Sequence, residues 1–206
     1  KQQLSLNLLQ QQVNPHFLYN TLDNICALAE LDEKETLIQL VMNLSSFYRS
    51  SLSNGKMHIS IGQELEISRA YLEILQIRYF HKFDFTITCP EALKNYSCIK
   101  LLLQPILENS IYHGIKGLDR HGILHIEAED TGDCIRFTIS DNGRGFSKED
   151  YEKIWQQDAD HFGIKSIQQR ILLYYGPGYG LSMESPQTGG CITVITLPKQ
   201  EGLPCH

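Results

Sequence analysis

The first quarter of the chain carries two runs of apolar residues at helical spacing. The first run extends from His16 to about Ala29, and the second covers residues 33–52. Apolar residues three and four positions apart lie on one face of a helix, so each run predicts an amphipathic helix. The short segment Glu30 to Asp32 joins them into a hairpin. Because a lone hairpin cannot bury both apolar faces, pairing of two copies into a four-helix bundle is expected.

The rest of the chain mixes helical and strand patterns, and residues 1–12 carry a narrow apolar stripe typical of a coiled-coil end. Apolar spacing predicts helices over residues 63–80, 101–117 and 163–175. Alternation of apolar and polar residues predicts strands over residues 83–87, 123–129, 134–140, 181–185 and 192–197. A stop and turn at residues 53–55 marks the best domain boundary. The pattern predicts an α+β protein, with a helical hairpin in residues 1–55 and a second domain in residues 56–206.

Two polar signals interrupt the apolar patterns of the second domain. Asn109 and His113 lie one turn apart on the same face of the helix predicted over residues 101–117. A solvated Asn on an amphipathic helix is the simpler explanation when this helix is considered alone. Downstream, however, the strand over residues 134–140 runs directly into the loop DNGRG at residues 141–145. The helix and the loop together indicate a ligand site.

A carboxylate at a strand end followed by two glycines suits a purine base and a phosphate tail. Asp141 can accept a hydrogen bond from an exocyclic amine, and Gly143 and Gly145 let the backbone approach the ligand. Asp-Asn-Gly is also an ordinary turn, so the loop alone leaves both interpretations open. The helix and the loop, in this order and joined by a β-rich spacer, resemble the GHKL superfamily of ATPases. The resemblance implies an α/β sandwich in which Asn109 holds Mg²⁺ on ATP and Asp141 holds adenine.

His16 opens the first helix within the motif NPHFLYNTLDNI, residues 14–25. Pro15 predicts a kink or a helix start at this point. Most histidines serve packing or capping, but a neutral imidazole is a good phosphoryl acceptor, and Asn20 could fix its tautomer. The motif resembles the phosphoacceptor box of the LytS/YesM-type sensor histidine kinases, NPHFL(F/Y)NxLN, with Asp23 in place of the last Asn. The resemblance implies that His16 takes the γ-phosphoryl group of ATP and passes it to an aspartate of a response regulator.

The same resemblance extends the nucleotide site toward the C-terminus. Gly163, at the start of a predicted helix, could offer backbone N–H groups to phosphate. Arg170 matches the arginine of the family pattern GxGLxNxxxRL and is a candidate phosphate contact, although a surface salt bridge would explain it equally well. Residues 147–162 are mostly polar, which is typical either of a mobile cover over the nucleotide or of a short solvated helix.

The ATP site departs from the family pattern at several positions. Tyr112, which with His113 belongs to the candidate nucleotide-binding residues, stands where the family usually has a lysine that meets the triphosphate. His161 replaces the first glycine of the second glycine box, and Cys191 replaces a threonine whose hydroxyl could assist Asp141. Losing one charge-assisted contact costs about 1.5–3 kcal/mol. His161, Lys165 or Arg170 could compensate, so we expect an active but weak kinase.

Composition narrows the function classes. The 206-residue chain has a formal net charge of −6 and no run of Lys or Arg, which gives no electrostatic footprint for nucleic acid or an anionic membrane. Its six cysteines lie far apart without a CxxC spacing, so they indicate neither a zinc site nor a disulfide framework and look like reduced thiols. No apolar stretch approaches the ~20 residues needed to span a bilayer.

The expected partners follow from the resemblance. They are ATP and Mg²⁺, a second copy of the chain in a homodimer, and the receiver domain of a response regulator, with no nucleic acid. Membrane attachment would come only through a sensor region before Lys1. The chain is therefore expected to be the cytoplasmic portion of a membrane-anchored bacterial sensor. Two alternatives stay open, a degenerate non-catalytic dimerising module and a GHKL ATP hydrolase.

Overall fold

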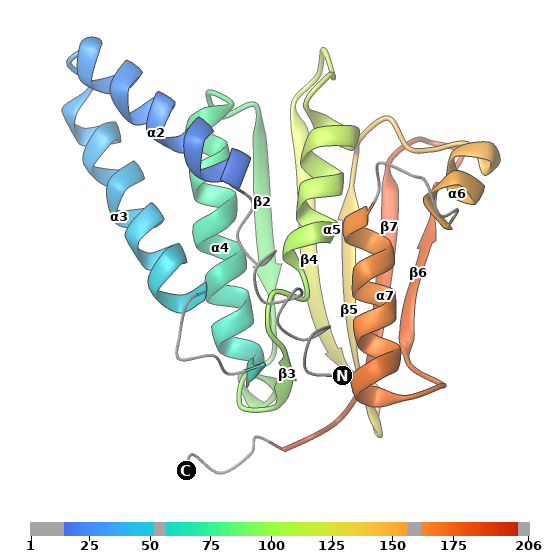
Figure 1. Cartoon of the computed structure of the whole chain (residues 1–206). Coiled ribbons are helices and arrows are strands. Elements are labelled where there is room, and N and C mark those ends of the chain that lie inside the picture. The colour runs from blue at the N-terminus through green and yellow to red at the C-terminus, as the bar shows by residue number, and fades with distance from the viewer. Residues whose placement is uncertain (1–14, 52–56, 156–161, 202–206) are drawn as a thin grey trace.

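The computed structural model describes residues 15–51, 57–155 and 162–201. The apolar stripe expected over residues 1–12, the turn at residues 53–55 and His161 lie outside these ranges. Within them the chain forms a helical hairpin, a layer of helices and a mixed β-sheet (Figure 1). The α+β class and the sandwich expected from the sequence are thereby confirmed.

A five-stranded mixed sheet has the strand order β2-β4-β5-β7-β6. Its strands are β2 (Phe83–Thr88), β4 (Gly122–Asp130), β5 (Cys134–Asp141), β6 (Gly180–Glu184) and β7 (Cys191–Pro198). β2 and β4 are parallel neighbours, whereas the other pairs are antiparallel. The alternating pattern predicted all of these strands, with bounds that differ by about one residue. It missed a separate two-stranded sheet of β1 (His58–Ser60) and β3 (Ser97–Ile99).

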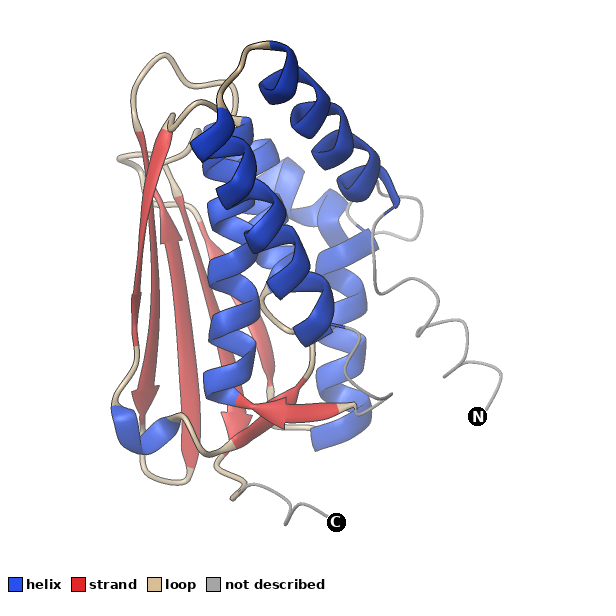
Figure 2. Cartoon of the chain, turned by 90° about the vertical axis from the view of Figure 1, so that its left-hand side faces the viewer, coloured by secondary structure: helices blue, strands red, loops and turns tan. Residues whose placement is uncertain are grey.

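Helices cover one face of the five-stranded sheet and leave the other face open (Figure 2). The covering helices are α4 (Ile61–Arg78), α5 (Gln104–Asn109) and α7 (Phe162–Tyr175), while α6 (Lys148–Trp155) lies near β6 and η2 (Glu91–Leu93) is a single turn. Buried and exposed residues alternate along β4, so Leu124, Ile126 and Ala128 face the helices. No described helix is long and apolar enough to cross a membrane.

α4 is the central helix of this layer. A capping box fixes its start, because the Ser60 Oγ accepts the N–H of Gln63 at 3.1 Å and the Gln63 Oε1 accepts the N–H of Ser60 at 3.1 Å. Most of its residues are buried, on nearly every side of the helix. A helix that is buried all round lies between two other layers, and α4 lies between the sheet and the hairpin.

The helical hairpin predicted at the start of the chain is confirmed. It consists of α2 (Pro15–Glu30) and α3 (Lys34–Ser51), and it packs on α4. Phe17 of α2 and Phe47 of α3 are buried, with ring centroids 4.9 and 5.8 Å from the ring of Tyr71 on α4. A third helix of the same chain therefore covers part of the apolar surface that periodicity alone assigned to a second copy.

The helix predicted over residues 101–117 differs from the observed one at both ends. The α-helix begins only at Gln104 and ends at Asn109, and a π-helix, η3 (Ser110–Ile115), continues it. Leu101 has a positive φ of 54°, and the carboxylate of Glu64 accepts the backbone N–H groups of Leu101 and Leu103 at 2.8 and 2.9 Å. These bonds hold the leucines in a buried turn. Their apolar spacing matches that of a helix, although the α-helix begins only at Gln104.

Candidate functional site

A pocket opens between the α5–η3 helix, the end of β5 and α6. Its lining residues are Asn109, Ser110, His113, Gly114, Asp141, Arg144, Gly145, Phe146, Asp150, Ile154 and Cys191. Of the residues singled out by the sequence, the pocket brings together Asn109, His113, Asp141, Gly145 and Cys191. Helix and strand ends that are far apart in the chain thus converge on one concave site, which is the usual setting for a small-molecule ligand.

Asp141 is the buried acceptor of this pocket. It ends β5, is 9% exposed, and its Oδ1 accepts the N–H of Gly143 at 2.8 Å. Its Oδ2 is buried and has no hydrogen-bond partner among the described residues. Burial raises the pKa of this carboxyl, while the Ser110 side chain and the amides of Gly143 and Cys191 act in the opposite direction. A buried acceptor without a partner costs about 1–3 kcal/mol, and a donor group on a ligand would recover it.

The glycine loop after Asp141 is held tightly against η3 and β7. The backbone N–H of Arg144 donates to the Gly114 carbonyl at 3.1 Å, and the N–H of Gly190 donates to the Gly143 carbonyl at 2.9 Å. A Cβ on Gly143 would lie 2.6 Å from the Gly114 Cα. Gly143 is therefore required by the packing of the protein itself, whereas Gly145 also lines the pocket.

Cys191 lies directly opposite Asp141 in the β5–β7 register and lines the pocket. Burial raises the pKa of its thiol to about 11. Its Sγ lies 3.6 Å from the Thr193 Oγ1. The side chain at this position is thus a protonated thiol at neutral pH.

The polar segment of residues 147–162 contains α6, and this helix forms one wall of the pocket. Ile154 is buried and lines the pocket together with Asp150. The rings of Phe146 and Tyr151 stack at 5.9 Å, which fixes α6 to the glycine loop. The described part of the segment is therefore a short helix with a packed apolar side, and residues 156–161 lie outside the described ranges.

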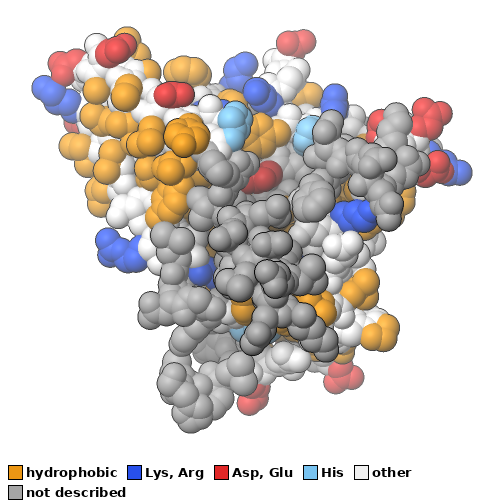
Figure 3. All heavy atoms as spheres, viewed as in Figure 1, with side chains coloured by type: hydrophobic (Ala, Val, Ile, Leu, Met, Phe, Trp, Pro, Cys, Tyr) orange, Lys and Arg blue, Asp and Glu red, His pale blue; other side chains and the backbone are white. Residues whose placement is uncertain are grey.

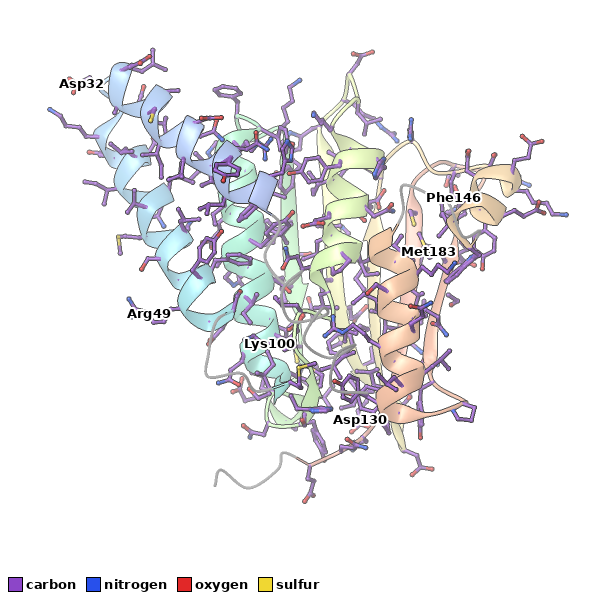
Figure 4. All side chains as sticks on the ribbon, viewed as in Figure 1. Asp32, Arg49, Lys100, Asp130, Phe146 and Met183 are labelled. Atoms are coloured by element: carbon purple, nitrogen blue, oxygen red, sulfur yellow. The ribbon has the colours of Figure 1, made fainter. Side chains whose placement is uncertain are left out.

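Arg170 does not reach the pocket. Its guanidinium donates to the backbone carbonyls of Leu101, at 3.2 Å, and of Lys100. Burial lowers the pKa of Arg170, and the nearby carboxylate of Glu64 raises it. Figure 4 shows Lys100 at the lower end of the helical layer and Phe146, which lines the pocket, at the upper end beside α6. The structure thus gives Arg170 a backbone-binding role instead of the predicted phosphate contact.

Tyr112 and Gly163 also lie outside the pocket lining. The hydroxyl of Tyr112 accepts a hydrogen bond from the Arg78 Nη1 at 3.1 Å, on the side of η3 that faces α4. Gly163 is exposed in the first turn of α7, and a Cβ there would lie 3.2 Å from the Pro105 Cβ. Neither position provides a lining group of the pocket.

His16 is exposed in the first turn of α2, and the next residue, Phe17, anchors that turn. The Phe17 ring is 2% exposed and lies 5.3 Å from the Phe47 ring. Asn20 was predicted to fix the His16 tautomer. Its amide nitrogen, Nδ2, has no hydrogen-bond partner within the described ranges and so does not contribute to that role here.

Several residues of the pocket lining, and Glu64 outside it, were assigned no role from the sequence. Arg144 lies within the DNGRG loop and lines the pocket, although only the Asp and the glycines of that loop were assigned roles. Glu64 is fully buried on α4 and binds the turn that precedes α5. The apolar residues that surround Glu64 in the sequence were a usable signal, because a charged residue on a helix buried all round must have partners.

Comparison with known proteins assigns the class that this fold and pocket define. Residues 96–201 match the model of the family described as histidine kinase-, DNA gyrase B-, and HSP90-like ATPase, and residues 4–83 match the histidine kinase model. The histidine kinase domain of the Erythrobacter litoralis EL346 blue-light activated kinase has a similar fold, with a TM-score of 0.52 at 16% identity over 97% of this chain and 96% of that one. The catalytic domain of the histidine kinase ThkA gives a TM-score of 0.54 at 17% identity over 70% of this chain and 96% of that one.

The curated relatives of the chain include sensor histidine kinases. The chain is 33% identical over 193 residues to the sensor histidine kinase YesM of Bacillus subtilis, covering 94% of this chain and 33% of YesM. It is 33% identical over 181 residues to the sensor histidine kinase BtsS of Escherichia coli, covering 88% of this chain and 31% of BtsS. The chain therefore belongs to the sensor histidine kinase family, as the motif at His16 indicated, and spans about one third of the length of these relatives.

Proposed function

We propose that the chain binds ATP in the pocket at Asp141 and transfers its γ-phosphoryl group to His16. The observation that carries this proposal is the buried carboxylate of Asp141, a residue of the pocket lining whose Oδ2 has no hydrogen-bond partner of good geometry within the described ranges. The exocyclic amine of adenine is a donor of the required kind, and a carboxylate acceptor strengthens such a bond. In this proposal residues 1–55 carry dimerisation and the phosphoacceptor, and residues 56–206 bind the nucleotide.

Phosphoryl transfer depends mainly on positioning and on neutralising phosphate charge. The lone pair of one His16 ring nitrogen forms the N–P bond while the bond from the γ-phosphorus to the bridging oxygen breaks. The electron pair of that bond leaves with ADP, and the imidazole releases its remaining N–H proton to water. The exposed position of His16 at the start of α2 supports this role, because an acceptor must be reached by the γ-phosphate and later by a response regulator.

Mg²⁺ fits the pocket only as a partner of the phosphates. The part of the chain that the structure describes holds no group of three or more His, Cys, Asp or Glu side chains suited to a metal. Mg²⁺ usually takes one or two protein ligands together with phosphate oxygens and water. The amide oxygen of Asn109, which lines the pocket, is the ligand that we assign to it. When bound, the ion neutralises part of the phosphate charge.

The hairpin supplies the surface for a homodimer. Figure 3 shows hydrophobic side chains gathered over α2 and α3. The exposed members of this surface are Tyr19, Leu22, Leu31, Ile38, Val41 and Met42. They lie on the hairpin beside the face that α4 covers, so a second hairpin could bury them in a four-helix bundle. We propose a homodimer formed by this surface.

A response regulator is the acceptor that we propose for the phosphoryl group on His16. One solved relative with a similar fold, the histidine kinase ThkA, is in complex with the response regulator protein TrrA, with a TM-score of 0.53 at 16% identity. The curated relatives are sensors longer than this chain. We accordingly propose that the chain works as the cytoplasmic part of a membrane-anchored sensor.

Incubation with γ-labelled ATP and Mg²⁺ tests the proposed reaction. We expect acid-labile, base-stable phosphate on the wild-type chain, none on His16→Ala, and greatly reduced label on Asp141→Ala. The variant Arg136→Ala, on the open face of β5, is the matched control and should label as the wild type does. Steady release of phosphate that survives His16→Ala would instead indicate an ATP hydrolase.

A non-catalytic dimerising module is the second candidate, and one observation favours it. Tyr112 stands in the place of a lysine, and Arg170, which could have compensated, binds backbone carbonyls and does not line the pocket. Absence of label at any nucleotide concentration, in folded wild-type protein that also gives no calorimetric heat with ATP, would establish this alternative over the kinase.

A further inference from the structure

Two cations share two tyrosine rings in the space between α4 and η3. The Arg78 guanidinium carbon lies 5.4 Å from the Tyr79 ring centroid and 5.9 Å from that of Tyr112. The Lys116 ammonium lies 5.8 Å from each of the same two rings. The rings meet edge to face, 6.2 Å apart, and the Tyr112 hydroxyl accepts a hydrogen bond from Arg78. We call Arg78 and Lys116 the cation pair.

The cation pair has no carboxylate within 4.0 Å among the described residues, although several other cations of the chain do. Lys94 meets Glu91 at 2.6 Å and Lys199 meets Asp130 at 2.5 Å. Two positive charges that lie over the same rings repel each other, and no carboxylate of the described residues lies beside them to reduce this repulsion. An anion placed between them would remove the repulsion. The arrangement is therefore suited to a phosphate.

The position of the cation pair relates it to both ends of the proposed reaction. Asn109 and His113 line the pocket, and Tyr112 lies between them in the sequence, directly before His113. On the other side, Tyr71 lies two turns before Arg78 on α4, and its ring lies 4.9 Å from that of Phe17, the neighbour of His16. Figure 3 shows Lys or Arg side chains and His side chains together along the upper edge of this face.

We propose that Arg78 and Lys116 bind the γ-phosphate of ATP as it passes from the pocket to His16. This inference rests on the proposed kinase function and names the residues that neutralise the transferred group. Tyr112 then replaces the lysine of related proteins indirectly, because its hydroxyl and ring hold Arg78 in place. A planar guanidinium can bind two phosphate oxygens at once, whereas an ammonium acts as a point charge.

Paired nucleotide titrations test this assignment. Calorimetry measures the affinity for ADP and for a non-hydrolysable ATP analogue, each with Mg²⁺, in wild type, Arg78→Ala, Lys116→Ala and the control Arg136→Ala. Loss of one charge-assisted contact, about 1.5–3 kcal/mol, corresponds to a roughly 10- to 100-fold loss of affinity. We expect Arg78→Ala to lose this much for the ATP analogue while its ADP affinity stays within about twofold of wild type. Phosphorylation of His16 should slow at least as much.

Two further variants separate charge from packing. Arg78→Lys keeps the charge and should recover part of the lost affinity for the analogue, and Tyr112→Phe keeps the ring but removes the acceptor that holds Arg78. Equal weakening of ADP and analogue would assign Arg78 a structural role and overturn the inference. The inference would also be overturned if Arg78→Ala and Tyr112→Phe kept the wild-type preference for the ATP analogue over ADP and the wild-type rate of His16 phosphorylation. The proposed kinase function would then stand. Absence of nucleotide binding in the wild type would refute the proposed function and the inference with it.

Discussion

Replacement of Glu64 by alanine should destabilise the protein more than any change of an exposed charge. Glu64 is 0% exposed on α4, and its two carboxylate oxygens accept the N–H groups of Leu101 and Leu103. Arg170 of α7 donates to carbonyls in the same turn, at Lys100 and Leu101. One acid and one base from different helices thereby hold the turn that starts α5.

The expected loss follows from these contacts. Hydrogen bonds to a charged group contribute about 1.5–3 kcal/mol each, and removing one partner of a buried charged pair costs about 3–5 kcal/mol in total. We therefore expect Glu64→Ala to lower the free energy of unfolding by about 3–5 kcal/mol. At about 2–4 °C per kcal/mol for a chain of this size, Tm should fall by roughly 6–20 °C.

The effect of pH on this contact has a definite sign. Burial raises the pKa of Glu64 above its ordinary value of 4.5, and the amides of Leu103 and Leu101 and the charge of Arg170 oppose the rise. The folded chain therefore binds this proton more tightly than the unfolded chain does. The difference in free energy of unfolding between wild type and Glu64→Gln should therefore favour wild type most below the ordinary pKa of 4.5. It should shrink as the pH rises through the raised pKa of the folded chain.

Urea and thermal unfolding of Glu64→Ala, Arg170→Ala and the double variant provide the measurement. Glu66→Ala, which removes an exposed acid from the same helix, is the control and should stay within about 0.5 kcal/mol of wild type. The two single losses should not add, because Glu64 and Arg170 both bind backbone groups of the same turn, at Leu101. A loss below about 1 kcal/mol in Glu64→Ala would refute the reasoning, since the two amides would then have found other partners.

Other changes test the pocket, the core and the dimer surface. Asp141→Asn should lower the affinity for ATP by roughly 10- to 100-fold in calorimetry, because only the carboxylate gives a charge-assisted bond. In wild type this affinity should fall as the pH drops through the raised pKa of Asp141, and the Asn variant should not show that fall. Gly143→Ala should unfold at lower urea than wild type, as its Cβ would meet Gly114 at 2.6 Å. Phe17→Ala should lose about 3–5 kcal/mol of unfolding free energy, which denaturation by urea measures. Met42→Asp should leave the monomer fold unchanged by circular dichroism but shift sedimentation equilibrium toward monomer, because Met42 is 62% exposed within one chain.

Periodicity predicted the elements of this fold well because their faces are cleanly divided. The five strands of the main sheet have one buried and one more exposed face, and their residues alternate accordingly. The sequence also predicted that a strand ends at about Asp141, since a change from alternation to glycine marks a strand end, and Asp141 lines the pocket. Local patterns such as these require no knowledge of distant residues.

Contacts between distant residues were beyond such patterns. Glu64 binds amides 37 and 39 residues away, and Arg170 binds carbonyls 69 and 70 residues away. Arg170 matched a family position, but a guanidinium binds a backbone carbonyl as readily as a phosphate, so the residue type alone could not choose. The π-helix of Ser110–Ile115 also had no signal, because its residues have the same apolar spacing as an α-helix.

The parallel pairing of β2 with β4 makes the pocket wall part of a crossover. The chain must travel from one end of the sheet to the other between these neighbours, and α5 and η3 lie on that return path. We therefore expect the pocket wall and the β2–β4 pair to form cooperatively. Nucleotide occupancy at 100 times Kd, worth about 2.7 kcal/mol, should protect the amides of β2 and β4 from hydrogen exchange as well as those of the pocket.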